Sequence, residues 1–157
     1  MLTPRHLRLP TLVIAAALLA ACGSKSPPGT SSATPAPPVA PSVTALEIDE
    51  LHPGTGAAIV TGQKAVVQYT GWLYEASAPD GKGKEFDSSR KSGQPFSFVV
   101  GASQVIKGWD QGVVGMKVAG TRRLVIPAEL AYGDVGAGGI IPPGATLVFD
   151  VELVAIE

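Results

Sequence analysis

Reactive side chains are scarce in this sequence of 157 residues, which contains two histidines and one cysteine. So few ligands cannot form a disulfide or a site built from several Cys and His residues, and no metal is expected. The G-x-S-x-G, Walker P-loop and G-x-G-x-x-G patterns are absent as well. The sequence therefore argues against covalent and metal-assisted catalysis, and it implies no cofactor.

Charge is also low, because 16% of the residues are charged, with 12 basic against 13 acidic. No excess of positive charge is available to neutralise phosphates, so nucleic acid is not expected as a partner. The 19 glycines and 14 prolines interrupt long regular elements and argue against a helical bundle. All nine aromatic residues lie between Tyr69 and Phe149. This contrast predicts one folded domain over residues 45–157.

Residues 1–21 have the pattern of a bacterial lipoprotein signal peptide. Arg5 and Arg8 precede an apolar run that is too short to span a bilayer. The run ends in LAAC, which resembles a lipobox and places the only cysteine, Cys22, where the lipid is attached. We expect a mature protein that starts at a lipidated Cys22 and is bound to the membrane through its acyl chains. An ordinary secretory signal with an incidental cysteine is the alternative.

The segment after the lipid site predicts a disordered stalk over residues 22–44. It consists mainly of Ser, Thr, Ala and Pro, with six prolines and Lys25 as its one charge. Such a composition cannot bury enough apolar surface to fold, and as extended chain it would reach about 70 Å at about 3.1 Å per residue. A proline-rich ligand for a partner domain is the alternative interpretation. In the lipoproteins that this N-terminus resembles, an Asp after the cysteine is associated with retention in the inner membrane of bacteria that have two membranes. Gly23 and Ser24 stand there instead, so the resemblance favours the outer membrane, facing the periplasm, if the source has two membranes.

Within the domain, residue spacing predicts an α+β fold. Two-residue alternation predicts strands at 66–73 and, most clearly, at 147–155, and further strands are expected at 45–51, 96–100 and 120–126. Val105, Trp109, Val113 and Met116 have helical spacing, weakened by three glycines. The sequence FDSS at 86–89 is typical of a turn or cap. We therefore expect a twisted antiparallel sheet wrapped around one short helix, with Trp109 against its concave face.

Five strings, in colinear order, resemble the FKBP-type peptidyl-prolyl cis/trans isomerases. They are VQYTGWLY (67–74), EFDSSR (85–90), QPFSFVVG (94–101), QVIKGWDQGVVGM (104–116) and AYGDVGAGGIIPPGATLVFDVEL (131–153). The resemblance implies a half-barrel around the helix, with an apolar pocket for the proline of an unfolded or exported polypeptide. Macrolides of the immunophilin type are implied as inhibitors.

The same resemblance implies roles for eleven residues. Trp109 is expected at the pocket floor, the Tyr132 hydroxyl and the Ile106 backbone N–H at the carbonyls of the bound peptide, and Asp87 at the prolyl carbonyl. Asp87 and Tyr132 are thus the expected catalytic residues. The expected walls and bordering loop comprise Tyr69, Phe86, Phe96, Val105, Ile106, Ile140, Ile141 and Phe149.

Three departures from the family pattern predict altered substrate and inhibitor preference. Ser92 replaces an Arg, which puts an expected salt bridge at Asp87 in doubt, and Gln104 and Ala137 replace a Glu and a His. Residues 74–85 form a longer loop than in the smallest members. Two other functions stay open: a non-catalytic proline-peptide binding module or chaperone, and a surface lipoprotein that serves mainly in adhesion or virulence.

Overall fold

The structure is a computed structural model that describes residues 43–157. The expected signal peptide, Cys22 and nearly all of the expected stalk lie outside the described residues. None of the helices between residues 43 and 157 has the length and hydrophobicity needed to cross a membrane.

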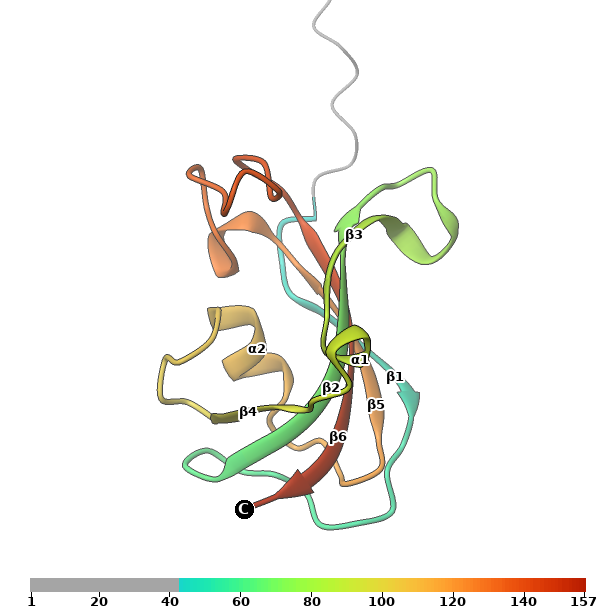
Figure 1. Ribbon diagram of the computed structural model, residues 1–157, viewed down its shortest axis with the longest axis vertical. Helices are drawn as coiled ribbons and strands as arrows, with labels where there is room; N and C mark the ends of the chain where they lie inside the picture. The colour runs from blue at the N-terminus through green and yellow to red at the C-terminus, as the bar shows by residue number, and fades with distance from the viewer. Residues whose placement is uncertain (1–42) are drawn as a thin grey trace, which may run out of the picture. The chain divides into compact units, whose positions relative to one another are not determined.

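One antiparallel sheet of six strands forms the domain, and a short helix lies on one side of it (Figure 1). The strands follow the order β1-β5-β6-β2-β3, and β4 pairs with β2 beyond the end of β3. This arrangement confirms the predicted twisted antiparallel sheet with a short helix. The strands are β1 (Glu47–His52), β2 (Lys64–Tyr74), β3 (Lys82–Ser88), β4 (Phe96–Val99), β5 (Thr121–Ile126) and β6 (Leu147–Ile156). The helical elements are α1 (Ser89–Ser92), α2 (Lys107–Gly112), and the 3-10 turns η1 (Pro79–Gly81) and η2 (Ala128–Leu130).

Alternation along β6 gives the sheet its two faces. Leu147, Phe149, Val151 and Leu153 are buried on the face that packs against α2, which we call the helix-covered face. Asp150 lies between them in sequence and therefore points to the opposite face, where β5 places Arg123 beside it. One strand thus supplies both the apolar core and a charged cluster.

The helix α2 is shorter than the predicted segment 105–116. It begins at Lys107, so Val105 and Ile106 precede it, and it ends at Gly112. Glycine explains both the short helix and its position. A Cβ at Gly108 would lie 2.4 Å from Ile126, and one at Gly112 would lie 2.6 Å from Leu124. These glycines weaken the helix but let it lie directly on β5.

A buried arginine fixes the C-terminal end of α2. The Arg122 Nη1 donates to the Gly112 carbonyl at 2.8 Å and to the Val114 carbonyl at 3.0 Å. Carbonyls at a helix end have no partner within the helix, so this side chain satisfies groups that would otherwise be buried without one. Arg122 therefore ties the C-terminal end of the helix to β5.

The expectation of a turn or cap at residues 86–89 was wrong for Phe86 and Asp87, whereas Ser88 does stand at the N-cap of α1. Phe86 and Asp87 belong to β3, which pairs with β2, and the turn α1 follows only at Ser89. Because Lys82 already lies in this strand, the long loop expected at 74–85 is reduced to residues 75–81. Pairing with β2, rather than local propensity, makes this segment a strand.

Candidate functional site

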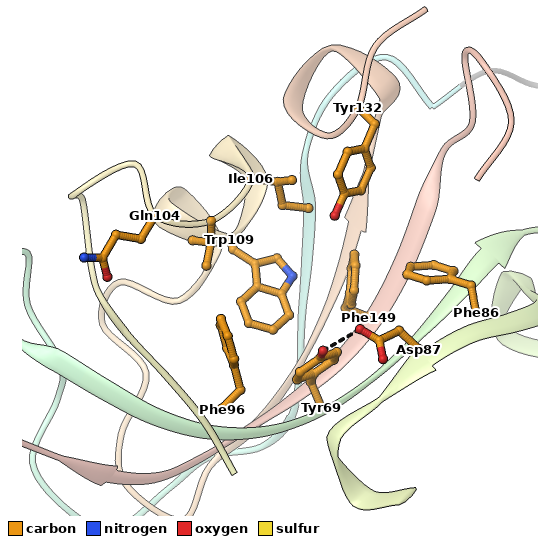
Figure 2. Close-up of a pocket in the computed structure, with 10 residues that line it drawn as sticks. Tyr69, Phe86, Asp87, Phe96, Gln104, Ile106, Trp109, Tyr132 and Phe149 are labelled. Carbon is orange, nitrogen blue, oxygen red and sulfur yellow. Dashed lines mark hydrogen bonds between the residues drawn. The ribbon is translucent and has the colours of Figure 1, made fainter. Parts of the chain in front are cut away.

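A pocket of about 180 Å³ opens between α2 and the helix-covered face (Figure 2). Its lining comes from β2, β3, β4, β6, α2, the loop before α2 and the segment after η2. Residues as distant in sequence as Tyr69 and Phe149 therefore meet at one site. The lining residues are Tyr69, Phe86, Asp87, Phe96, Gln104, Val105, Ile106, Trp109, Tyr132 and Phe149.

Perpendicular aromatic contacts build the walls of the pocket. The Trp109 ring lies 5.0 Å from Tyr69 and 5.3 Å from Phe149, with interplanar angles of 83° and 86°. Edge-to-face pairs of this kind are favourable and hold each ring in one orientation. Trp109 and Phe149 are each 4% exposed, whereas Phe96 is 41% and Tyr132 is 40% exposed. The first two thus form a rigid floor and the last two an accessible rim.

Gly71 makes the aromatic packing around Phe149 feasible. It lies opposite Phe149 in the pairing of β2 with β6. A Cβ at this position would approach the Phe149 ring to 2.7 Å and the Phe86 ring to 2.8 Å. Any larger residue would push these rings into the pocket or away from each other. The small residue on β2 therefore lets two rings meet edge to face at 5.5 Å.

The polar side-chain groups of the pocket are two phenols, one indole N–H, one carboxylate and the amide of Gln104. The Tyr69 hydroxyl donates to Asp87 Oδ2 at 2.5 Å, as the dashed line in Figure 2 shows. Burial raises the pKa of Tyr69, and the hydrogen bond to Asp87 and its charge raise it further. Burial and the charge of Asp87 also raise the pKa of Tyr132. Both phenols therefore stay protonated at neutral pH and can act as hydrogen-bond donors.

Two further donors of residues that line the pocket make no hydrogen bond among the described residues. The buried Trp109 Nε1 has no hydrogen-bond partner in the described chain. The Ile106 carbonyl accepts from the Trp109 backbone N–H at 2.9 Å, but within residues 43–157 the Ile106 N–H donates to no acceptor. The Tyr132 hydroxyl points into the same space (Figure 2). A buried donor without a partner is rare, so a ligand with acceptor oxygens suits this site.

The loop that carries Val105 and Ile106 is held from α2. Asp110 Oδ1 accepts from the Gly101 N–H at 2.9 Å, and Oδ2 accepts from the Ser103 N–H at 3.0 Å. Ser103 has a φ of 55°, a conformation that needs such support in a residue other than glycine. Sequence reasoning missed Asp110, because a carboxylate in a helix gives no local sign of the distant N–H groups that it binds.

The structure brings nine of the eleven predicted site residues together. Ile140 and Ile141 do not line the pocket: Ile140 is 53% exposed on the loop before β6, and Ile141 is 7% exposed within the core. Gln104, considered in the sequence only as a departure, does line it, and its Oε1 accepts from the Val99 N–H at 2.9 Å. The roles of the eleven residues toward a peptide stay predictions.

The chemistry of the site follows from this geometry. Within residues 43–157 no group of three or more His, Cys, Asp or Glu side chains could hold a metal ion. The site offers apolar walls and neutral donors, and such a pocket suits proline, whose ring is apolar and whose nitrogen carries no hydrogen. An antiparallel sheet around a short helix, with a proline-sized hollow between them, places the domain among the peptidyl-prolyl cis–trans isomerases.

The chain belongs to the FKBP-type family of that class. The family model described as FKBP-type peptidyl-prolyl cis-trans isomerase matches residues 56–154. An FK506-binding protein of Neisseria meningitidis serogroup B is 49% identical over 111 residues, which cover 71% of this chain and 95% of that protein. The peptidyl-prolyl cis-trans isomerase FPR2 of Saccharomyces cerevisiae is 53% identical over 96 residues, or 61% of this chain and 67% of the relative.

Solved structures agree with this assignment. The crystal structure of FkpA from Escherichia coli matches with a TM-score of 0.61 and 43% sequence identity, covering 73% of this chain and 49% of that one. A peptidyl-prolyl cis-trans isomerase from Pseudomonas syringae matches with a TM-score of 0.59 and 39% sequence identity, covering 71% of this chain and 75% of that one. The comparisons confirm the predicted fold and the predicted prolyl isomerase activity.

Proposed function

We propose that this isomerase acts on X-Pro bonds of exported polypeptides and that removal of water from the bond in the aromatic pocket lowers the barrier to its rotation. The observation that carries the proposal is the hollow of about 180 Å³ with Trp109 and Phe149 at its floor, where the buried Trp109 Nε1 has no hydrogen-bond partner among the described residues. Isomerisation of X-Pro bonds takes tens to hundreds of seconds without a catalyst, slow enough to limit folding.

The energy required is modest. Rotation must overcome a barrier of about 18–20 kcal/mol, which corresponds to about 0.01 per second at its upper end. A turnover of about 100 per second requires a barrier lower by about 5.4 kcal/mol. The planar amide is more dipolar than the twisted one, so removal of its water in an apolar pocket raises the ground state more than the transition state. No group has to exchange a proton.

Three polar groups are proposed to orient the peptide. The Tyr132 hydroxyl and the Ile106 N–H donate to peptide carbonyls, and Asp87 forms a polar edge at the prolyl carbonyl. Their positions at the pocket support this assignment. Because relatives of this chain are named FK506-binding proteins, we also propose that FK506-type macrolides compete with peptides for the pocket.

We propose in addition that the protein is a lipoprotein of the cell envelope, anchored through Cys22 and separated from the membrane by residues 22–44. The LAAC sequence at 19–22 supports the anchor, and the absence of Asp after Cys22 favours the outer membrane facing the periplasm. Labelling of whole cells with a radioactive fatty acid tests this. Label in the wild-type protein and none in Cys22→Ser supports the anchor. Label in both proteins, or in neither of them, contradicts it.

An isomer-specific assay on an X-Pro peptide tests the activity in solution. The full chain carrying Cys22→Ser avoids lipid, and it should accelerate isomerisation in a manner that an FK506-type macrolide suppresses. Tyr132→Phe removes one donor while keeping the ring, so a lower kcat with retained peptide binding would support the proposed orientation. Peptide binding without any turnover in the unsubstituted pocket would instead favour the non-catalytic binding module.

A further inference from the structure

A second hollow, of about 300 Å³, adjoins the aromatic pocket and has a different chemistry. Tyr69, Asp87 and Phe96 line both hollows, so the two lie on either side of the same wall. Serines dominate the rest of its lining, and we call it the serine hollow. Its full lining is Tyr69, Asp87, Ser88, Ser89, Ser92, Gln94, Pro95 and Phe96.

Asp87 brings a negative charge to this hollow, and nothing in the described chain neutralises it. Its Oδ2 accepts from the Tyr69 hydroxyl, a neutral donor. Within residues 43–157 no Lys or Arg nitrogen lies within 4.0 Å of the carboxylate. The two basic residues that follow Asp87 in sequence are engaged elsewhere, since Arg90 pairs with Glu152 at 2.5 Å and Lys91 pairs with Glu85 at 2.7 Å.

The serines around Asp87 offer acceptors rather than free hydrogens. Ser92 Oγ donates to the Ser89 carbonyl at 2.8 Å and accepts from the Gln94 N–H at 3.4 Å. Ser89 Oγ donates to Gln68 Oε1 at 2.5 Å and accepts from the Tyr69 N–H. A hydroxyl that has used its hydrogen keeps acceptor capacity. The hollow therefore combines a carboxylate with hydroxyl oxygens, and no basic side chain lines it.

Ser92 is one of the residues that line this hollow. Ser92 stands where the sequence comparison led us to expect an Arg paired with Asp87. An arginine side chain from that position would fill the hollow and neutralise the carboxylate, whereas the short Ser92 side chain turns back to the Ser89 carbonyl. The departure thus leaves both a space and a charge beside the proline pocket.

We infer that the serine hollow binds the lysine or arginine side chain of a polypeptide whose proline occupies the aromatic pocket. The cation pairs with Asp87 and donates to the surrounding hydroxyl oxygens. Because consecutive Cα atoms lie about 3.8 Å apart, a residue one or two positions from the proline reaches the adjoining hollow. This inference rests on the proposed function and names a class of substrate for it: X-Pro segments with a neighbouring basic residue.

A peptide series tests the inference on the unaltered pocket. The substrates carry Lys, Arg, norleucine or Glu at each position from two before to two after the proline, and kcat/KM is measured with the full chain carrying Cys22→Ser. At one position, Lys and Arg should exceed norleucine by about 1.5-fold to fivefold, the range of an exposed ion pair, and Glu should fall below it. The preference should vanish as the salt concentration is raised from about 0.01 M to about 1 M, because the Debye length falls from about 30 Å to about 3 Å.

A pair of variants locates the preference. Ser92→Arg introduces a cation at the hollow, and the ratio of kcat/KM for lysine over norleucine peptides should fall to about one. Ser97→Arg adds the same charge on β4, at an exposed residue that lines neither hollow, and it should keep the wild-type ratio.

Each outcome bears on one of the two claims. Equal rates for lysine and norleucine at every position, or an equal loss of preference in Ser97→Arg, overturn the serine hollow while leaving the isomerase intact. Absence of turnover on every peptide overturns the proposed function, and this inference with it. A preference for lysine that Ser92→Arg abolishes and Ser97→Arg retains supports the inference.

Discussion

The two faces of the sheet treat polar groups in opposite ways. On the face away from α2, Asp150 accepts from Arg123 Nε at 2.8 Å and from Lys82 Nζ at 2.6 Å. Lys82 also lies 4.3 Å from the centre of the Trp72 ring. On the helix-covered face, the Trp109 Nε1 has no partner and Asp87 has no cation among the described residues. On the face away from α2, Asp150 thus pairs with both Arg123 and Lys82. On the helix-covered face, the Trp109 Nε1 and the Asp87 carboxylate can still bind groups of a ligand.

The contrast arises within single strands. Phe149 and Asp150 are neighbours on β6, and strand alternation sends the ring to the pocket and the carboxylate to the ion-pair cluster. The ion pairs of Asp150 stabilise the sheet from one side, and the rings of the pocket pack on the other. The two sets of interactions are therefore separable by substitution.

Replacing a tryptophan on each face should produce the largest difference between them. Trp109→Ala removes the pocket floor and leaves a cavity among Tyr69 and Phe149, so we expect a loss of about 3–5 kcal/mol in unfolding free energy and little remaining isomerase activity. Trp72→Ala, on the opposite face, removes a half-buried ring and should retain most of the activity. Urea unfolding and the peptide assay measure both effects. Equal loss of activity in the two variants would contradict the division between the faces.

Neutralising the centre of the ion-pair cluster should lower stability while sparing turnover. Asp150→Asn leaves Arg123 and Lys82 without their shared counter-charge, and because the groups are partly screened by solvent we expect a loss of about 1–2 kcal/mol. Burial opposes ionisation of Asp150, but hydrogen bonds from Arg123 and Lys82 outweigh it and lower the pKa of the carboxyl. The folded-state value thus lies below the unfolded value of about 3.9.

The lowered pKa of Asp150 makes the stability of the fold depend on pH in the acidic range. Ionised Asp150 contributes its full stabilisation above the unfolded pKa, and this contribution is lost as the pH falls through the lower folded-state pKa. Wild-type stability should therefore decrease more steeply below about pH 4 than that of Asp150→Asn. Urea midpoints measured at several acidic pH values test this, and parallel curves for the two proteins would show that another group is responsible.

Some parts of this molecule are readable from the sequence and others are not. The strand β6 is evident because Leu147, Phe149 and Val151 alternate with acidic residues. The aromatic residues that meet at the pocket are identifiable by their order within five family-like strings. The strand β3 escapes prediction, because Lys-Gly-Lys-Glu-Phe-Asp-Ser has little β propensity and pairing with β2 decides its conformation.

Contacts between distant segments account for what the sequence does not reveal. The length of α2 depends on close approach to β5 at Gly108 and Gly112, which helical spacing cannot show. The support of the pocket loop by Asp110 joins segments whose relation appears only in the fold. The same is true of the serine hollow, which depends on where Ser92 points rather than on any local pattern.

Loosening the loop before α2 should lower the isomerase activity by less than removal of the pocket floor does. Asp110→Ala removes both acceptors from the Gly101 and Ser103 N–H groups, so Val105 and Ile106 lose their fixed position and we expect kcat/KM to fall about tenfold. Asp110→Asn keeps one acceptor oxygen and should restore part of the loss. Peptide kinetics with both variants measure the effect. If Asn and Ala behave alike, the hydrogen bonds do not position the loop.

The smallest expected effect is that of pH on turnover. The pKa values of Tyr69 and Tyr132 are raised, by burial first and by Asp87 second, so both phenols remain protonated donors throughout the neutral range. Because the proposed rotation transfers no proton, kcat/KM on a peptide without ionisable side chains should change less than about twofold from about pH 6 to 8. A bell-shaped profile within that range would require a titrating acid and base in the pocket. A flat profile, together with a stability that depends on Asp150 at acidic pH, would show that the helix-covered face acts without proton transfer. The opposite face would then be the one that ion pairs stabilise.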